Sequence, residues 1–353
     1  MPFGAGPIIG LDIGTSAVRA ALVAQTRGGW SLLRFGQVAL SPGAVAGGEV
    51  RDDGQVADAI AQLWKRARFK TKKVIVGVSN QRVVVRQVDV PYLEEKELRS
   101  SIRFQVADHI PMSVEDAEID YWTLDDYSTD SGDRMLRLLL VAAASDMVES
   151  FVGAASSAGL QPAGVDLSAF AVARAVSPAA RGELGIAGAE AVVDVGAGTT
   201  NIVVHRGGEP QFVRILMIGG DDATSALGRE IDLEFDEAEA TKLDLARGVG
   251  APAARRVLDD QVASLVSEIH GSVEYYLSQD EGEPISSVIV TGGGSLVPGL
   301  FEGLQDLLRT PVRRGSPFDD LDASKSRLTQ EQLAQVEQVA AAAIGLGMGR
   351  GRK

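Results

Sequence analysis

The feature that most constrains the fold of this 353-residue chain is a glycine-turn pattern that occurs twice. The first copy is GLDIGTSAVRAALV, beginning at Gly10, and the second is VVDVGAGTTNIVVH, beginning at Val192. In each copy a short apolar strand ends near an Asp, a glycine turn with hydroxyl side chains follows, and a second strand leaves at once. The repeat predicts two hairpins that hold one ligand from opposite sides.

Both turns have residues that suit a nucleotide phosphate tail. Their glycines let backbone N–H groups approach phosphate oxygens, and their hydroxyls add further donors. The turn residues expected around the phosphates are Gly14, Thr15, Ser16, Gly196, Gly198, Thr199 and Thr200. Asp12 and Asp194 are expected to face each other across the cleft and to hold Mg²⁺ through its hydration waters.

Other glycine motifs fit these turns less well. The GAGTT sequence could be half of a dinucleotide-binding fingerprint, but that motif must open a helix, and the residues after it have the pattern of a strand. A Walker A loop needs Gly-Lys-Ser/Thr, which the chain lacks. A structural glycine turn would explain either copy alone, but it explains the pair poorly.

A third glycine turn follows the apolar run VIVT, which begins at Val288. Its residues, Gly292, Gly293, Gly294 and Ser295, allow a flat ligand to lie against the backbone, and a helix is expected to begin near Pro298. Gly219 and Gly220 form a further turn of this kind. Each turn follows a predicted strand, so each is expected to approach the same nucleotide.

A helix upstream of the third turn carries AEATK, which places Glu239 and Lys242 three residues apart on one face. Taken alone, this spacing favours a solvated surface ion pair that contributes a few tenths of a kcal/mol.

Composition narrows the function classes. The chain has no cysteine and three histidines far apart, which excludes thiolate metal sites and argues against a histidine-built one. Its net charge of −14 has the wrong sign for broad contact with nucleic acid or anionic lipid. No apolar run approaches a membrane span, and the N-terminus lacks the pattern of a signal peptide. We therefore expect a cytoplasmic protein that does not bind nucleic acid.

Predicted strands and helices alternate along the chain, which favours an α/β protein. Between the two repeated hairpins lies a block of about 80 residues with the order strand, helix, strand, strand, helix. Its first helix has apolar residues at Leu98, Ile102 and Val106, and Pro111 is expected to follow its end. The block is therefore interpreted as an inserted subdomain.

Together these motifs resemble the actin-like ATPase superfamily. Residues 10–16 resemble its first phosphate motif, residues 194–200 its second, and residues 291–295 its adenosine motif. AEATK resembles its ribose and adenine helix, and Gly345-Leu-Gly347 resembles its second connecting motif. The resemblance implies an actin-like fold with two RNase H-like domains flanking a nucleotide cleft, with ATP and Mg²⁺ as cofactors.

Within the superfamily, the inserted block resembles the PilM family of type IV pilus assembly proteins. It is VPYLEEKELRSSIRFQVADHIPMSVEDAEIDY, from Val90 to Tyr121, and AGLQPAGVDLSAFAVARA follows from Ala158. The resemblance implies an FtsA-like subdomain 1C and a groove between subdomains 1A and 1C. That groove would take the N-terminal cytoplasmic tail of a PilN-like inner-membrane protein. Other pilus assembly proteins are further expected partners, self-association stays open, and membrane contact would be indirect, at the cytoplasmic face of the inner membrane.

The resemblance also implies a division of the chain into subdomains. The expected segments are 1–82 (1A), 83–158 (1C), 159–190 (1A), 191–228 (2A), 229–286 (2B), 287–335 (2A) and 336–353 (a C-terminal helix returning to 1A).

The first connecting segment departs from the superfamily pattern. Many superfamily ATPases have a Gln or Glu there that orients the attacking water. Here Asp166 and Ser168 are the two alternatives, so ATP turnover is expected to be slow at most.

Two other functions stay open: an FtsA-like cell-division filament tethered to membrane, and a small-molecule kinase. The chain ends AAAAIGLGMGRGRK, without the bulky apolar residues of a membrane helix, and shows no additional catalytic constellation for a kinase.

Overall fold

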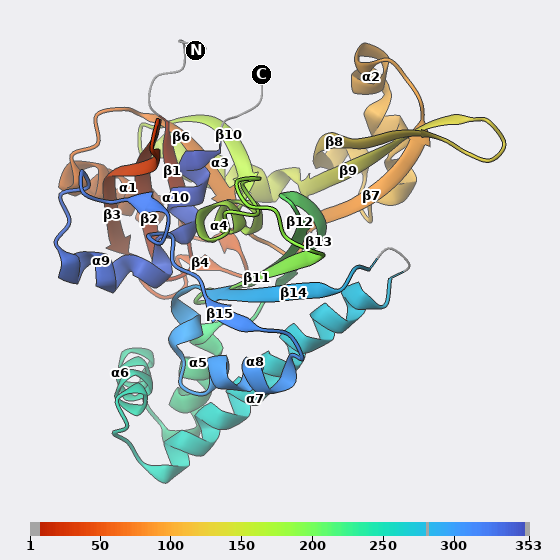
Figure 1. The fold of residues 1–353 in the computed structure, drawn as a ribbon. Helices are drawn as coiled ribbons and strands as arrows, with labels where there is room; N and C mark the ends of the chain where they lie inside the picture. The colour runs from red at the N-terminus through yellow and green to blue at the C-terminus, as the bar shows by residue number, and fades with distance from the viewer. Residues whose placement is uncertain (1–7, 280–281, 350–353) are drawn as a thin grey trace.

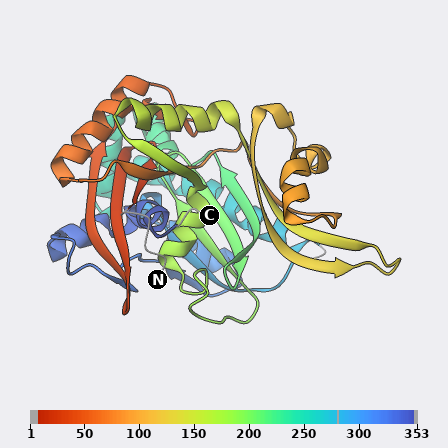
Figure 2. The ribbon, with the colours of Figure 1, turned by 90° about the horizontal axis from the view of Figure 1, so that it is seen from above.

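A computed structural model describes residues 8–279 and 282–349 of the chain (Figure 1). Two larger sheets form the main body, and a third, smaller sheet projects to one side (Figures 1 and 2). No helix in the described ranges is long and apolar enough to cross a membrane.

The first sheet has six strands in the order β10-β6-β1-β2-β3-β16. Its strands are β1 (Ile9–Ile13), β2 (Ala17–Thr26), β3 (Gly29–Ala39), β6 (Lys73–Val78), β10 (Gln161–Leu167) and β16 (Leu321–Asp322). The first repeated hairpin forms β1 and β2, which pair antiparallel. β1 then pairs with β6, and β6 with β10, in parallel.

The second sheet repeats this arrangement in the order β13-β12-β11-β14-β15. Its strands are β11 (Ala189–Val195), β12 (Thr200–Arg206), β13 (Glu209–Leu216), β14 (Ile285–Thr291) and β15 (Val312–Arg314). β11 pairs antiparallel with β12 and in parallel with β14, as β1 does with β2 and β6. The internal repeat in the sequence thus corresponds to two sheets with the same central topology.

Helices cover both faces of each sheet. α1 (Asp53–Ala67) and α3 (Ser145–Ser157) share a core with the outer face of the first sheet. α4 (Ser168–Val176) and α10 (Ala341–Met348) pack on its inner face, in a core that also takes Val192, Val203 and Ile289 of the second sheet. The helices that pack on the far side of the second sheet are α7 (Pro252–Leu277) and α8 (Leu300–Leu307). Beyond them, α5 (Gly220–Ile231) and α6 (Phe235–Ala246) share a separate core with the start of α7.

The projecting sheet has the order β7-β9-β8 and carries one helix, α2. Its elements are β7 (Val83–Pro91), α2 (Glu95–Gln105), β8 (Ala117–Ser128) and β9 (Arg134–Ala144). Leu98 and Ile102 of α2 pack against Leu138 and Leu140 of β9, as the helical spacing predicts. α2 ends at Gln105, and short 3₁₀ turns at Ala107–His109 and Val114–Asp116 lead to β8.

The structure differs from the expected block 83–158 at its C-terminal end. Met147 and Phe151 of α3 belong to the core of the first sheet and not to that of the projecting sheet. The unit that projects therefore comprises residues 83–144. The sequence grouped α3 with the insert because it follows β9 directly, whereas packing depends on which sheet covers the apolar face of the helix.

Two other expectations need correction near the C-terminus. The segment expected in the second domain, 287–335, already returns to the first sheet at β16, which pairs with β3. The C-terminal helix expected over 336–353 begins only at Ala341, because the chain first forms α9 (Gln330–Val336) and a 3₁₀ turn (Glu337–Val339) and then α10. The remaining short strands are β4 (Val45–Ala46) and β5 (Glu49–Val50).

Candidate functional site

Three parallel strands of the first sheet and two parallel strands of the second end at one cavity of about 300 Å³ between the sheets. The residues that follow β1, β6, β10, β11 and β14 all line it: Gly14, Ser79, Ser168, Gly196 and Gly292. Ligands in open α/β sheets bind at the carboxyl ends of the strands, and the volume lies at the lower end of the range of ligand pockets. The two sheets thus converge on one site.

Most of the predicted site residues line this cavity. They are Asp12, Gly14, Thr15, Ser16, Ser168, Asp194, Gly196, Thr199, Gly220, Glu239, Lys242, Gly292, Gly293 and Gly294. The predicted residues outside its lining are Asp166, Gly198, Thr200, Gly219 and Ser295.

Asp12 and Asp194 both line the cavity, one from each hairpin. Asp12 Oδ2 lies 3.5 Å from Arg19 Nη1, and Asp194 Oδ2 accepts a 3.2 Å hydrogen bond from Asn201 Nδ2. Burial, with a smaller contribution from the charge of Asp12, raises the pKa of Asp194 to about 6, although the hydrogen bond from Asn201 opposes the shift. Burial likewise raises the pKa of Asp12, although Arg19 opposes the shift.

A divalent cation fits this pair of carboxylates. Two carboxylates in one site disfavour each other's ionised form, and a cation between them removes that repulsion. No group of three or more acidic or histidine side chains with metal-binding geometry occurs in the described ranges. The residues therefore suit Mg²⁺ that keeps most of its hydration shell.

The two hairpins touch through the first hairpin's hydroxyl turn. A Cβ atom added at Gly198 would lie 2.7 Å from Thr15 Oγ1, so only glycine permits this approach. Ser79 Oγ donates a 2.7 Å hydrogen bond to Asn201 Oδ1 and so joins the end of β6 to the second hairpin. Thr200 Oγ1 instead donates to the Ile218 carbonyl at 2.8 Å, which gives Thr200 a structural role.

Glu239 and Lys242 are not a solvated surface pair. Lys242 Nζ lies 2.6 Å from Glu239 Oε2, and it donates to the Gly220 carbonyl at 3.0 Å and to Thr224 Oγ1 at 2.7 Å. The Lys242 side chain is only 9% exposed. The pair therefore joins α6 to the start of α5 and lines the cavity, so the local expectation of a solvated ion pair was wrong.

The third glycine turn packs directly on the second hairpin. Gly292 has φ 91°, and a Cβ atom at Gly294 would lie 2.6 Å from the Gly196 carbonyl oxygen. Ser295 is buried and donates a 2.6 Å hydrogen bond to the Gly292 carbonyl, so it holds the turn and does not line the cavity. The helix α8 begins at Leu300, after Gly299, two residues past Pro298, near which its start was expected.

The structure separates the two alternatives of the first connecting segment. The Asp166 carboxylate pairs with the Arg174 guanidinium and accepts from the Leu167 backbone N–H, and it does not line the cavity. Ser168, one residue past the end of β10, does line it. Asp166 therefore lies outside the cavity, because its carboxylate is held by Arg174 of α4.

Gly219 also lies outside the cavity. Its N–H donates to Asp222 Oδ2 at 2.7 Å, and a Cβ atom there would lie 2.4 Å from the Ala197 carbonyl oxygen. Gly219 therefore lets the start of α5 pack closely against the turn of the second hairpin.

Sequence reasoning missed Arg19, Ser79 and Asn201. Arg19 pairs in register with Asp12 across the first hairpin, and Asn201 pairs with Asp194 across the second. The two contacts are therefore equivalent positions of the internal repeat. Aligning the second strands of the two copies would have identified both residues.

Comparison with known structures identifies the class of fold. The MreB5 protein of Spiroplasma citri bound to ADP is similar over 88% of this chain and 92% of its own, with TM-score 0.50 and 13% identity. The ethanolamine utilization protein EutJ of Carboxydothermus hydrogenoformans is similar over 99% and 91%, with TM-score 0.57 and 16% identity. This chain has the actin-like ATPase fold, as its motifs predict.

A more specific similarity gives the family. The sequence model of the type IV pilus assembly protein PilM matches residues 10–351, and the chain belongs to that family. The structure of a PilM–PilN type IV pilus biogenesis complex is similar over 97% of both chains, with TM-score 0.84 and 26% identity.

Cell division proteins FtsA are more distant relatives. FtsA of Neisseria meningitidis is 27% identical over 204 residues, which cover 51% of this chain and 48% of that protein. FtsA of Streptococcus pneumoniae is 22% identical over 351 residues, covering 87% and 75%. The first match thus spans about half the length of the relative.

Proposed function

We propose that this protein is an ATP-binding assembly protein of a type IV pilus or related secretion machine. The observation that carries the nucleotide site is the pair Asp12 and Asp194, placed at equivalent ends of two hairpins on one cavity. In this proposal the glycine turns and the hydroxyls of Thr15, Ser16 and Thr199 surround the phosphates. Glu239 and Lys242 lie at the ribose, and Gly292 to Gly294 lie along the adenosine.

ATP acts here mainly as a conformational ligand. When bound, Mg²⁺ would neutralise phosphate charge between Asp12 and Asp194. Of the two residues expected to orient an attacking water, only Ser168 lines the cavity, and a hydroxyl is a weaker base than a carboxylate. We therefore expect ATP binding with slow turnover.

The partner in this proposal is the N-terminal cytoplasmic tail of a PilN-like inner-membrane protein. The similarity to a PilM–PilN complex over nearly the whole chain supports it. The tail would dock between the first sheet and the projecting sheet, and it would hold the protein at the cytoplasmic face of the membrane.

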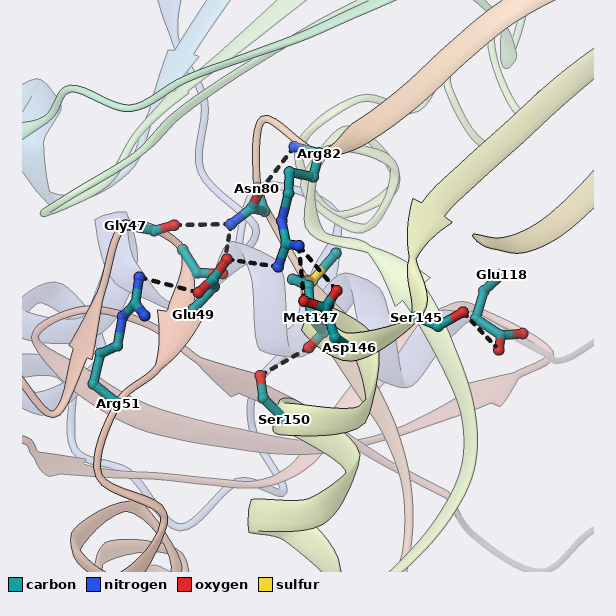
Figure 3. A network of polar contacts seen from close by, with 11 residues as sticks. Gly47, Glu49, Arg51, Asn80, Arg82, Glu118, Ser145, Asp146, Met147 and Ser150 are labelled. Atoms are coloured by element: carbon teal, nitrogen blue, oxygen red, sulfur yellow. Dashed lines mark hydrogen bonds and ion pairs between the residues drawn. The ribbon is translucent and has the colours of Figure 1, made fainter. Parts of the chain in front are cut away.

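A polar network joins the nucleotide cavity to the base of the projecting sheet (Figure 3). The Asn80 amide donates to the Gly47 and Gly48 carbonyls at 2.8 and 3.1 Å, and Gly48 lines the cavity. The Arg82 backbone N–H donates to Asn80 Oδ1 at 2.8 Å. The loop beside the cavity is thus tied to the residue before β7.

Arg82 extends this network to the chain segment that leaves the projecting sheet after β9. Its guanidinium contacts both Asp146 oxygens at 2.9 Å and Glu49 at 2.7 Å (Figure 3). Asp146 lies in α3, just after β9. The Arg82 side chain therefore connects the segment that enters the projecting sheet with the segment that leaves it. This connection supports a docking groove whose shape changes when nucleotide binds.

The nucleotide site is tested by Asp12→Ala and Asp194→Ala. Each variant is expected to lose Mg-ATP affinity at least tenfold, measured by isothermal titration calorimetry, because each removes a carboxylate that supports the hydrated cation. Asp58→Ala, an exposed position on α1, is the matched control. Undiminished affinity in both site variants would contradict the assignment.

The partner is tested with a synthetic PilN-like tail peptide and the full chain, by fluorescence anisotropy with and without Mg-ATP. Binding that changes with nucleotide supports the proposal, and absence of binding in both conditions contradicts it. A pull-down from membranes, looking for a single-span protein with a short cytoplasmic tail, checks the same point with natural partners.

A further inference from the structure

A dense run of basic residues lies at the end of the first sheet where β6 begins, opposite the end that faces the nucleotide cavity. The run KRARFKTKK spans the end of α1, the following loop and the first residue of β6. Its basic residues, named here the basic edge, are Lys65, Arg66, Arg68, Lys70, Lys72 and Lys73. All six are exposed, in a chain whose net charge is −14.

The position of the basic edge follows from the strand register. Lys73 is the first residue of β6, and Val74 pairs with Ile9 at the start of β1. Ser79, which lines the cavity, follows the other end of β6. At about 3.3 Å per residue, the six residues of β6 separate the two sites by roughly 20 Å. A ligand at one site therefore does not touch the other.

No acidic side chain neutralises the basic edge. None of its six members takes part in an ion pair within residues 8–279 and 282–349. The three segments that meet there, 20–48, 61–78 and 150–165, contain no Asp or Glu. Arg27, in the β2–β3 turn at the same edge, and Arg34, whose Nη1 donates to the Ala67 carbonyl at 3.3 Å, extend the positive surface.

An acidic residue, Asp322, lies on the side of the sheet away from β6 and β10. Asp322 lies in β16, at the outer edge of the sheet, where its Oδ2 accepts a hydrogen bond from Ser31 Oγ. β3, β2, β1 and β6 lie between β16 and β10, which is the strand at the opposite side of the sheet. The six exposed basic residues therefore gather on the side of the sheet away from Asp322, in a protein with a net charge of −14.

We propose that the basic edge rests on an anionic phospholipid surface and orients the protein on the membrane. The inference rests on the proposed function in one respect: a PilN-like tail would bring the basic edge to the membrane. It adds a direct, electrostatic contact to the indirect one through the partner. Each Lys or Arg near an anionic leaflet adds attraction that decays within a Debye length, so the contact needs membrane proximity.

The shape and composition of the basic edge favour lipid over nucleic acid. Single-stranded nucleic acid is held by exposed aromatic rings beside basic residues. The two aromatic residues of the run, Trp64 and Phe69, pack on each other with ring centroids 5.1 Å apart, and Phe69 is buried. Neither pocket described for residues 8–279 and 282–349 is lined by basic-edge residues. Flexible lysines without a pocket suit a fluid layer of headgroups.

The test is flotation of the full-length protein with vesicles of phosphatidylcholine alone or with roughly one third phosphatidylglycerol. The variant is Lys70→Gln/Lys72→Gln/Lys73→Gln, and the matched control is Arg247→Gln/Arg255→Gln/Arg256→Gln, which makes the same charge change on exposed residues of the second domain. At low salt the wild type and the control are expected to bind the anionic vesicles. The variant is expected to bind them about tenfold more weakly, and about 0.5 M salt is expected to release all three.

Each contrary outcome overturns the proposal. These are no binding of the wild type to anionic vesicles, equal loss in variant and control, and binding that resists salt or ignores lipid charge, as an inserted apolar helix would give. A DNA duplex that displaces the protein from anionic vesicles, at a phosphate concentration equal to that of the anionic lipid, would also overturn it. That result would show that the basic edge binds polyanions in general. Mg-ATP and tail-peptide affinities of the variant, measured in parallel, are expected to be unchanged, so a failure of the nucleotide site or of the partner site is seen separately.

Discussion

At the scale of single residues, the ionised form of Asp194 carries a cost in stability. Asp194 is buried beside another carboxylate, and its pKa is raised from 3.8 to about 6. Below pH 6 the folded protein takes up a proton there that the unfolded chain takes up only near pH 3.8. The free energy of unfolding therefore falls as pH rises through this interval, and above pH 6 the unliganded protein bears the full cost.

Asp194→Asn tests this cost directly. Asparagine keeps an acceptor for the Asn201 amide and removes the charge. Without ligand, the variant is expected to be more stable than the wild type at pH 7 to 8, by at most about 3 kcal/mol, with the difference vanishing toward pH 4. Chemical denaturation across this pH range measures it. A wild type more stable than the variant at pH 8 would contradict the prediction.

The same substitution separates stability from function. Because the cation loses one of its two supporting carboxylates, Asp194→Asn is expected to weaken Mg-ATP binding while it stabilises the unliganded protein. Asp58→Asn, exposed on α1, is the control and is expected to change stability by less than about 0.5 kcal/mol.

At the scale of secondary-structure elements, α4 and α10 fix how the two large sheets meet. α10 crosses α4 with Gly345 against Ala171, and a Cβ atom at Gly345 would lie 1.7 Å from the Ala171 carbonyl oxygen. Gly10 of β1 meets the same helix, where a Cβ atom would lie 2.1 Å from the Ala343 carbonyl oxygen. These close backbone contacts explain why an apolar helix contains the glycines of Gly345-Leu-Gly347, although the glycines do not line the cavity.

Gly345→Ala is expected to lower the free energy of unfolding by about 2–3 kcal/mol, because backbone must move to admit the methyl group. Gly153→Ala on α3 is the matched control, since a Cβ atom there meets nothing within 4 Å. That control is expected to be neutral or to gain about 0.5–1 kcal/mol from helix propensity. Thermal unfolding of both variants measures the difference, and equal melting temperatures would contradict the packing argument.

Local sequence signals predicted most elements that contain the site, and they failed where packing decides. Strand–Asp–glycine turns located both hairpins, and the spacing of Leu98, Ile102 and Val106 predicted α2. The hydrophobic pattern of the sequence did not predict β3 (Gly29–Ala39), because glycine and arginine interrupt it. The segment forms a strand through its pairing with β2. It also missed Ser79, whose role depends on the contact of β6 with the second hairpin.

At the scale of the whole molecule, three polar contacts link parts that meet only in the folded protein. Ser79 joins the first sheet to the second hairpin, Arg82 joins the cavity loop to the projecting sheet, and Gln87 Nε2 donates a 2.9 Å hydrogen bond to Gln211 Oε1 of β13. The projecting sheet thus contacts both domains. A change in the angle between the domains must alter at least one of these contacts.

Arg82→Ala is expected to uncouple nucleotide binding from tail-peptide binding. Its ion pairs are partly exposed and contribute little to stability, so the variant is expected to fold and to bind Mg-ATP with affinity within about threefold of the wild type. The ratio of tail-peptide affinities with and without Mg-ATP is expected to move toward one, because the network from Gly48 through Asn80 no longer reaches Asp146. Peptide titrations in both nucleotide states measure the ratio.

Arg99→Ala on α2 provides the comparison for that uncoupling. Arg99 also forms an ion pair, with Glu95 at 2.7 Å, but within one exposed helix of the projecting sheet. The control is expected to keep the wild-type ratio, so a loss of coupling in Arg82→Ala alone assigns the effect to the junction and not to the charge of the projecting sheet. An unchanged ratio in Arg82→Ala would mean that the nucleotide signal travels instead through the Gln87–Gln211 contact, which Gln211→Ala then tests in the same titration.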